Sequence, residues 1–116
     1  MTEEQELYRI FRETRQEVQR LKAALEGFFL MADATEEHKT EYGQYLKRRI
    51  RPAVEQLIEE EAIENIRELH RLGWFHEREL EGFIKTARSR EKPASLMYLL
   101  QLKNESYGYQ DKDFSL

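Results

Sequence analysis

The stretch that decides the fold is residues 3–32, EEQELYRIFRETRQEVQRLKAALEGFFLMA. Its apolar residues recur at alternating intervals of four and three when Thr14 is counted among them: Leu7, Phe11, Thr14, Val18, Leu21, Leu25, Phe28 and Ala32. This spacing is typical of one face of an α-helix that packs along another helix. We therefore predict one continuous helix from about Glu3 to Ala32, with Thr2 and Gln5 forming a capping box at its start.

The remaining sequence predicts four further helices, which makes about five in an all-α chain. The second helix runs from about Glu36 to Ile50 after residues 33–35, which form a turn and a new helix cap, and with the first it forms a helical hairpin over residues 1–51. Residues 52–108 then form two shorter antiparallel helix pairs. We expect residues 1–108 to form a single helical domain and residues 109–116 to form a polar C-terminal tail.

Proline and glycine mark the ends of the shorter helices. Pro52 begins or sharply kinks a helix because it lacks a backbone N–H. Gly73 suits a helix end with positive φ, and Trp74 can then fold back onto the helix. The other expected landmarks are helix starts near Glu77 and Pro93 and a helix stop at Gly108.

The composition agrees with a helical protein and excludes several classes. Glu outnumbers Asp by 20 to 3 and Leu outnumbers Val by 14 to 2, which favours residues that lose little freedom in a helix. The absence of cysteine excludes disulfides and fits a cytoplasmic protein. The net charge of −4 argues against a dedicated DNA-binding domain. The longest apolar run, residues 28–32, is too short to span a membrane.

The shorter helices contain an internal repeat. At an offset of 26 the matched positions are Val54, Leu57 and Ile58 with Leu80, Phe83 and Ile84. At an offset of 33 they are Ile63, Ile66 and Leu69 with Leu96, Leu99 and Leu102. Two antiparallel helix pairs of this length are the unit of helical solenoids. Two unrelated amphipathic helices would share the same stripes, so coincidence is an equally good explanation.

The stretch IRELHRLG at 66–73, followed by a helix and then LMYLLQLKN at 96–104, resembles degenerate ankyrin-type repeats over residues 52–108. In that family the second helix ends in Leu-x-x-x-Gly, and the period is about 33 residues. The Thr-Pro-Leu-His signature of the family is missing from this chain. The resemblance implies a stack of helices that binds proteins, and it implies no catalytic chemistry.

The sequence contains no strong catalytic, phosphate-binding or metal-binding motif. We therefore predict a non-enzymatic helical module that binds a protein partner or self-associates through apolar helix faces. We expect no cofactor, metal or small-molecule substrate. Large apolar side chains supply most of the binding energy at such surfaces. The candidate partner-binding residues are Leu7, Phe11, Val18, Leu21, Trp74 and Phe75.

Two alternative functions stay open. Arg71 and His76 have the Arg-x-x-x-x-His spacing that resembles a group of small helical ribonucleases, in which such a pair acts at the active site. The pair would supply a cation and a general base. Lys47, Arg48 and Arg51 share one side of a predicted helix and form a candidate anion-binding cluster, which would suit a nucleic-acid backbone. A solvated helix face balanced by nearby glutamates explains the same cluster, and the net charge favours that interpretation.

Overall fold

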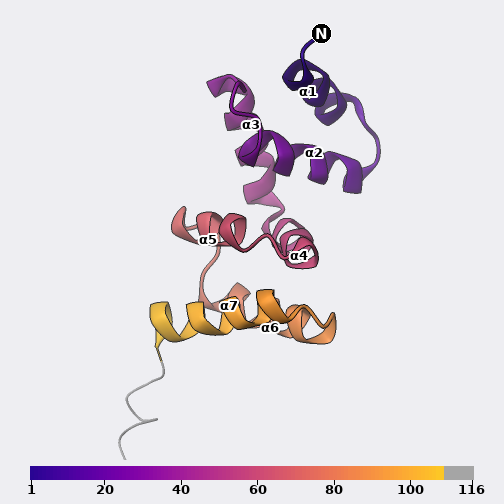
Figure 1. Ribbon diagram of the computed structural model, residues 1–116. Helices are drawn as coiled ribbons and strands as arrows, with labels where there is room; N and C mark the ends of the chain where they lie inside the picture. The colour runs from indigo at the N-terminus through magenta and orange to yellow at the C-terminus, as the bar shows by residue number, and fades with distance from the viewer. Residues whose placement is uncertain (109–116) are drawn as a thin grey trace, which may run out of the picture. The chain divides into compact units, whose positions relative to one another are not determined.

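The computed structural model describes residues 1–108, which form seven α-helices and one π-helical turn and contain no strand (Figure 1). The prediction of an all-α fold is confirmed, whereas the prediction of about five helices is wrong. The tail expected at residues 109–116 lies outside the described residues. The chain divides into two compact units, Met1–Ala53 and Val54–Leu116.

The first unit contains α1 (Glu3–Glu13), α2 (Glu17–Phe29) and α3 (Glu36–Arg48), and it ends within the first turn of α4 (Ile50–Glu60). α1 packs against α2, and α2 packs against α3. The buried apolar side chains of these helices include Leu7, Phe11, Leu21, Ala24, Leu25, Tyr42, Tyr45 and Leu46. Phe11 is central to this core because its ring meets the rings of Tyr42 and Tyr45 edge-on, with centroids 5.0 and 5.4 Å away.

The predicted continuous helix over residues 3–32 is broken at residues 14–16, and this break separates α1 from α2. Thr14 has an extended backbone with ψ of 146°, and its hydroxyl accepts the N–H of Gln16 at 3.1 Å. Threonine side chains offer the backbone such bonds as an alternative to the helix. The break changes the phase of the apolar stripe, so that Leu21 is buried while Val18 is 63% exposed.

Both predicted caps of this unit are confirmed. The hydroxyl of Thr2 accepts the N–H of Gln5, and the side chain of Gln5 accepts the N–H of Thr2. The hydroxyl of Thr35 accepts the N–H of His38 at 3.0 Å and so begins α3 after the predicted turn. These bonds satisfy backbone donors that the first turn of a helix leaves free.

α2 and α3 approach most closely where Gly27 meets the ring of Tyr42. A Cβ atom at Gly27 would overlap three atoms of that ring, so only glycine fits there without a shift. Tyr42 is fully buried, and among residues 1–108 its hydroxyl has no hydrogen-bond partner. Burial, followed by the nearby charge of Glu4, raises the pKa of Tyr42 to about 12.

The second unit contains the rest of α4 together with α5 (Ile63–Arg71), α6 (Glu77–Ser89), α7 (Pro93–Leu102) and the π-helical turn η1 (Lys103–Tyr107). α7 packs against α5 and α6, and η1 packs against α6 and α7. The most deeply buried side chains are Val54, Leu57, Ile58, Ile66, Leu69, Phe75, Leu80, Phe83, Ala87 and Leu99.

The second unexpected break lies between α4 and α5, where the sequence shows neither glycine nor proline. Glu61 adopts a left-handed conformation with φ of 52°, which is uncommon for a residue with a side chain. Its N–H bonds to the carbonyl of Ile58, and the N–H of Ala62 bonds to the carbonyl of Leu57, which is the Schellman pattern. The carboxylate of Glu61 accepts the N–H of Ser95 at 2.9 Å, and this bond supplies the capping contact that α7 otherwise lacks.

The stop predicted at Gly73 and the start predicted at Pro93 are confirmed. Gly73 has φ of 78°, and the N–H of Trp74 bonds to the carbonyl of Leu69 at 3.1 Å. A third such stop occurs at Glu91, which has φ of 55° and ends α6. Glu91 therefore has the same left-handed backbone as Glu61. Within residues 1–108, however, the carboxylate of Glu91 forms no hydrogen bond with another helix, as that of Glu61 does.

The positions matched by the internal repeat are buried alike. Val54 and Leu80 are both fully buried, as are Ile66 and Leu99. Any two amphipathic helices of one core would show the same similarity, so the ankyrin-type repeat stays a prediction. Within residues 1–108 no helix is long and apolar enough to cross a membrane.

Candidate functional site

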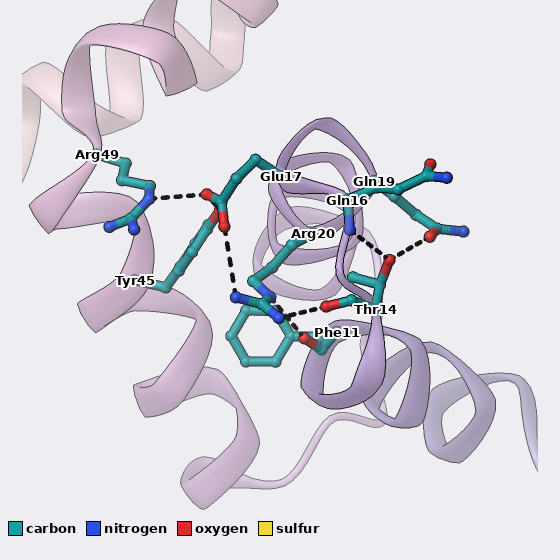
Figure 2. Close-up of polar contacts among 8 residues, drawn as sticks. All are labelled: Phe11, Thr14, Gln16, Glu17, Gln19, Arg20, Tyr45 and Arg49. Atoms are coloured by element: carbon teal, nitrogen blue, oxygen red, sulfur yellow. Dashed lines mark hydrogen bonds and ion pairs between the residues drawn. The ribbon is translucent and has the colours of Figure 1, made fainter.

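The candidate site lies in the first unit, where the break between α1 and α2 faces α3. Arg20 of α2 reaches back to the end of α1, and its guanidinium donates to the carbonyls of Phe11 and Thr14. These carbonyls belong to the last turn of α1 and would otherwise lack a partner within the helix. Arg20 thus fixes the corner between α1 and α2, as Figure 2 shows.

Glu17, at the start of α2, joins this corner to α3. Its carboxylate accepts hydrogen bonds from the hydroxyl of Tyr45 at 3.2 Å and from Nε of Arg49 at 3.1 Å, and it lies 3.5 Å from Arg20 (Figure 2). The hydrogen bond from Arg49 is the main reason that the pKa of Glu17 lies below its usual value. The guanidinium of Arg49 also lies over the ring of Tyr45, 4.9 Å from its centroid.

These contacts form one wall of a small apolar groove, which we call the Val18 groove. It has a volume of about 230 Å³ and is lined by Glu17, Val18, Leu21, Tyr45, Arg49 and Pro52. Leu21 and Tyr45 are buried, whereas Val18 is 63% exposed. The groove therefore offers apolar surface to solvent with one acidic and one basic side chain beside it.

A second pocket shares Tyr45 with the Val18 groove, and we call it the Arg48 pocket. It has a volume of about 260 Å³ and is lined by Phe11, Arg12, Arg20, Glu41, Gln44, Tyr45 and Arg48. Arg12 donates to Glu41 at 3.0 Å and to the hydroxyl of Tyr8 at 2.9 Å. Within residues 1–108 Arg48 has no ion pair, so the pocket retains a free cation.

The predicted partner-binding residues fall into two groups. Leu7, Phe11, Leu21 and Phe75 are buried, so their side chains contribute to the core. Trp74 is half-buried, and Val18 alone of the six is largely exposed. Of the predicted apolar stripe, Val18 and Leu21 both line one groove, and Val18 is the member that is exposed to solvent.

The predicted anion-binding residues Lys47, Arg48 and Arg51 are all exposed, and none has an ion pair within residues 1–108. Among the described residues they form no direct ion pair with the nearby glutamates, although Glu41 lines the same pocket as Arg48. Arg48 lines the Arg48 pocket, which makes it the member of the cluster with a defined cavity.

The candidate ribonuclease pair is split between two helices. Arg71 lies at the end of α5, and His76 is the residue before α6, with the left-handed Gly73 between them. The guanidinium of Arg71 donates two hydrogen bonds to Glu68, at 2.9 and 2.6 Å. The cation that would stabilise a phosphodiester is thus already bound to a carboxylate of its own helix.

Two of the three histidines, His38 and His70, take part in local packing. His38 pairs with the buried carboxylate of Glu4 and stacks on the ring of Tyr8, 3.5 Å between centroids. His70 contacts the hydroxyl of Tyr107 at 2.9 Å, and burial lowers its pKa. Within residues 1–108 no three histidine or carboxylate side chains are arranged to hold a metal ion.

Three residues that shape the site were not singled out from the sequence: Arg20, Tyr45 and Arg49. One signal was available, because Thr14 and Glu17 form a Thr-x-x-Glu pattern, which is typical of a helix start. That pattern would have indicated a new helix start in this region, two residues before the N-cap that the structure shows at Gln16.

Comparisons with protein families, curated proteins and solved structures found no match to this chain.

Proposed function

We propose that this protein is a non-enzymatic helical module that binds a segment of another protein, and that the Val18 groove receives an apolar side chain of that segment. The observation that carries the proposal is the exposed Val18 in an apolar groove that the buried residues Leu21 and Tyr45 also line. Burying one such side chain contributes about 1.5–3 kcal/mol, so the loss of this contact would weaken binding about tenfold or more. The absence of cysteine fits a cytoplasmic location for such a module.

A short segment fits this surface better than a second copy of the chain. Stable dimers bury roughly 1,200 Å² or more in total. The large exposed apolar residues of the first unit are Met1, Val18 and Leu30, and only Val18 lines the groove. Such a small patch supports the docking of one or two side chains. An ankyrin-like binding role for residues 52–108 stays a further prediction.

The test is a selection of random linear peptides, displayed on phage, against the full-length protein. We expect enriched peptides that share an apolar anchor and that lose about tenfold or more in affinity with the Val18→Asp variant. Leu30→Asp is the matched control, because Leu30 is 72% exposed in the same unit and lies outside the groove. Leu21→Asp is not suitable, since Leu21 is buried and the substitution would damage the fold.

Far-ultraviolet circular dichroism of each variant checks that folding is unchanged. The proposal is wrong if every enriched peptide binds Val18→Asp as tightly as the wild type. It is also wrong if sedimentation shows a dimer of the wild type that Val18→Asp dissociates, because a second copy would then occupy the groove.

A further inference from the structure

The Arg48 pocket shares Tyr45 with the Val18 groove and places a cationic side chain beside it. Among its lining residues, Arg12 is paired with Glu41 and Arg20 with Glu17, while Arg48 has no ion pair within residues 1–108. Arg48 is the last residue of α3, and Arg49, which caps this helix, lines the Val18 groove. The two cavities therefore meet at the end of α3, and the residue they share is Tyr45.

The pocket provides hydrogen-bond donors that no described residue uses. Arg48 and Gln44 are both exposed, and neither side chain forms a hydrogen bond within residues 1–108. A guanidinium offers parallel N–H donors that suit the two oxygens of a carboxylate or phosphoryl group. The side-chain amide of Gln44 adds a further donor in the same pocket. This set fits one anionic group.

Tyr45 forms a wall that the Val18 groove and the Arg48 pocket have in common. Tyr45 is buried, its hydroxyl donates to Glu17, and its ring lies beneath the guanidinium of Arg49. Figure 2 shows Glu17 between Arg49 and Arg20, which line the groove and the pocket respectively. A ligand that binds in both cavities thus meets apolar residues in the Val18 groove and a cationic side chain in the Arg48 pocket.

We propose that the segment bound in the Val18 groove carries an anionic side chain that binds Arg48 in the neighbouring pocket. This inference rests on the proposed function. It defines the partner as a peptide in which a carboxylate or phosphorylated residue lies close in sequence to an apolar anchor. The anion would displace no existing ion pair, because Arg48 has none within the described part of the chain.

The surrounding charges favour a single anion over a nucleic-acid backbone. Glu41 lines the pocket and Glu17 lies beside it, so successive phosphates would meet carboxylates as well as arginines. Residues 1–53 hold ten basic and ten acidic side chains. Backbone binding to RNA relies on a net excess of basic contacts.

The experiment uses the peptides enriched against the wild-type protein. We expect Asp or Glu to recur near their apolar anchor, and we expect Arg48→Glu to weaken binding about tenfold or more. Lys22→Glu is the matched control, because Lys22 is an exposed cation of the same unit that lines neither cavity. A selection repeated on Arg48→Glu should enrich Lys or Arg at the same peptide position.

The outcomes separate this inference from the proposed function. Peptides that depend on Val18 but tolerate Arg48→Glu would overturn the inference and leave the proposed function standing. Peptides that depend on neither residue would overturn both. Replacing the selected Asp or Glu with phosphoserine identifies the natural anion, since tighter binding indicates a phosphorylated partner and weaker binding indicates a carboxylate. If single-stranded RNA competes with the peptide and loses affinity in Arg48→Glu, the pocket binds nucleic acid and the inference is wrong.

Discussion

Single residues carry functions in this protein that their type alone does not reveal. Gly27 is required because the ring of Tyr42 occupies the space of its missing side chain. Glu61 and Glu91 have the same left-handed backbone, yet only the carboxylate of Glu61 accepts a hydrogen bond from another helix. Val18 and Leu21 belong to one predicted stripe, yet only Leu21 is buried. Each difference depends on a neighbour from a distant part of the sequence.

Tyr42 gives a test at the scale of one atom. Its buried hydroxyl lacks a partner within residues 1–108, and a buried polar group without one destabilises the folded state. We expect Tyr42→Phe to raise the free energy of unfolding by about 0.5–2 kcal/mol, measured by urea denaturation. Tyr45→Phe is the matched control and should lower it, because the hydroxyl of Tyr45 donates to Glu17. A loss of stability in Tyr42→Phe would contradict this account.

At the scale of the helix, the sequence predicted the boundaries that local chemistry sets. Thr2 and Thr35 form their caps within one turn, and Gly73 and Pro93 act through their own backbone preferences. The break at Glu61 could not be predicted in this way, because Ser95, 34 residues later, holds the Glu61 side chain. The break at Thr14 was missed because its place in the heptad pattern concealed its capping chemistry.

The same limit applies to the candidate site. The sequence predicted a partner-binding role for Val18 and an anion-binding role for Arg48; both residues line cavities, and both roles stay predictions. It placed Phe11 and Leu21 on the same binding surface, although both are buried. A helical pattern tells which residues share a face. It cannot tell which face a neighbouring helix covers once the helix is interrupted.

The two left-handed glutamates give a test at this scale. The side chain of Glu91 is exposed and forms no hydrogen bond within residues 1–108, so Glu91→Gly should relieve backbone strain and stabilise the protein by about 0.5–1 kcal/mol. Glu91→Ala retains the strain and should give no gain. Glu61→Gly removes the carboxylate that caps α7 and should gain less than Glu91→Gly. Urea denaturation compares the three, and an equal gain at both positions would refute the role of Glu61.

At the scale of the whole molecule, charge is distributed unevenly along the chain. Residues 1–53 are neutral overall, so the net charge of −4 resides in residues 54–116. Most ion pairs join residues three or four apart on one helix or are largely exposed, and such pairs contribute little to stability. The fold therefore depends mainly on its apolar core and its helix ends. Changes in salt should affect ligand binding more than folding.

Tyrosine ionisation gives a test on the whole chain. Burial raises the pKa of Tyr42, Tyr45 and Tyr107, and a hydrogen bond to Glu41 raises that of Tyr8. The folded protein thus holds these protons more tightly than the unfolded chain, whose tyrosines ionise near pH 10. Their stabilising contribution is complete below pH 10 and is lost as the pH rises through the folded values, about 12 for Tyr42.

We therefore expect the free energy of unfolding to fall steadily from pH 10 to pH 12, measured by urea denaturation at each pH. Ultraviolet absorbance of tyrosinate should appear at higher pH in the folded protein than in urea. Tyr42→Phe should reduce the fall. Stability that stays constant across this range would show that these side chains ionise equally well in the folded state.

The close approach of Gly27 to Tyr42 has a consequence for the ancestry of this chain. A relative with a larger side chain at the glycine position has no room for the tyrosine and must carry a smaller residue opposite it. The two positions are therefore expected to vary together across species rather than independently. A search for distant kin can use that paired exchange as its signature where overall sequence identity has faded.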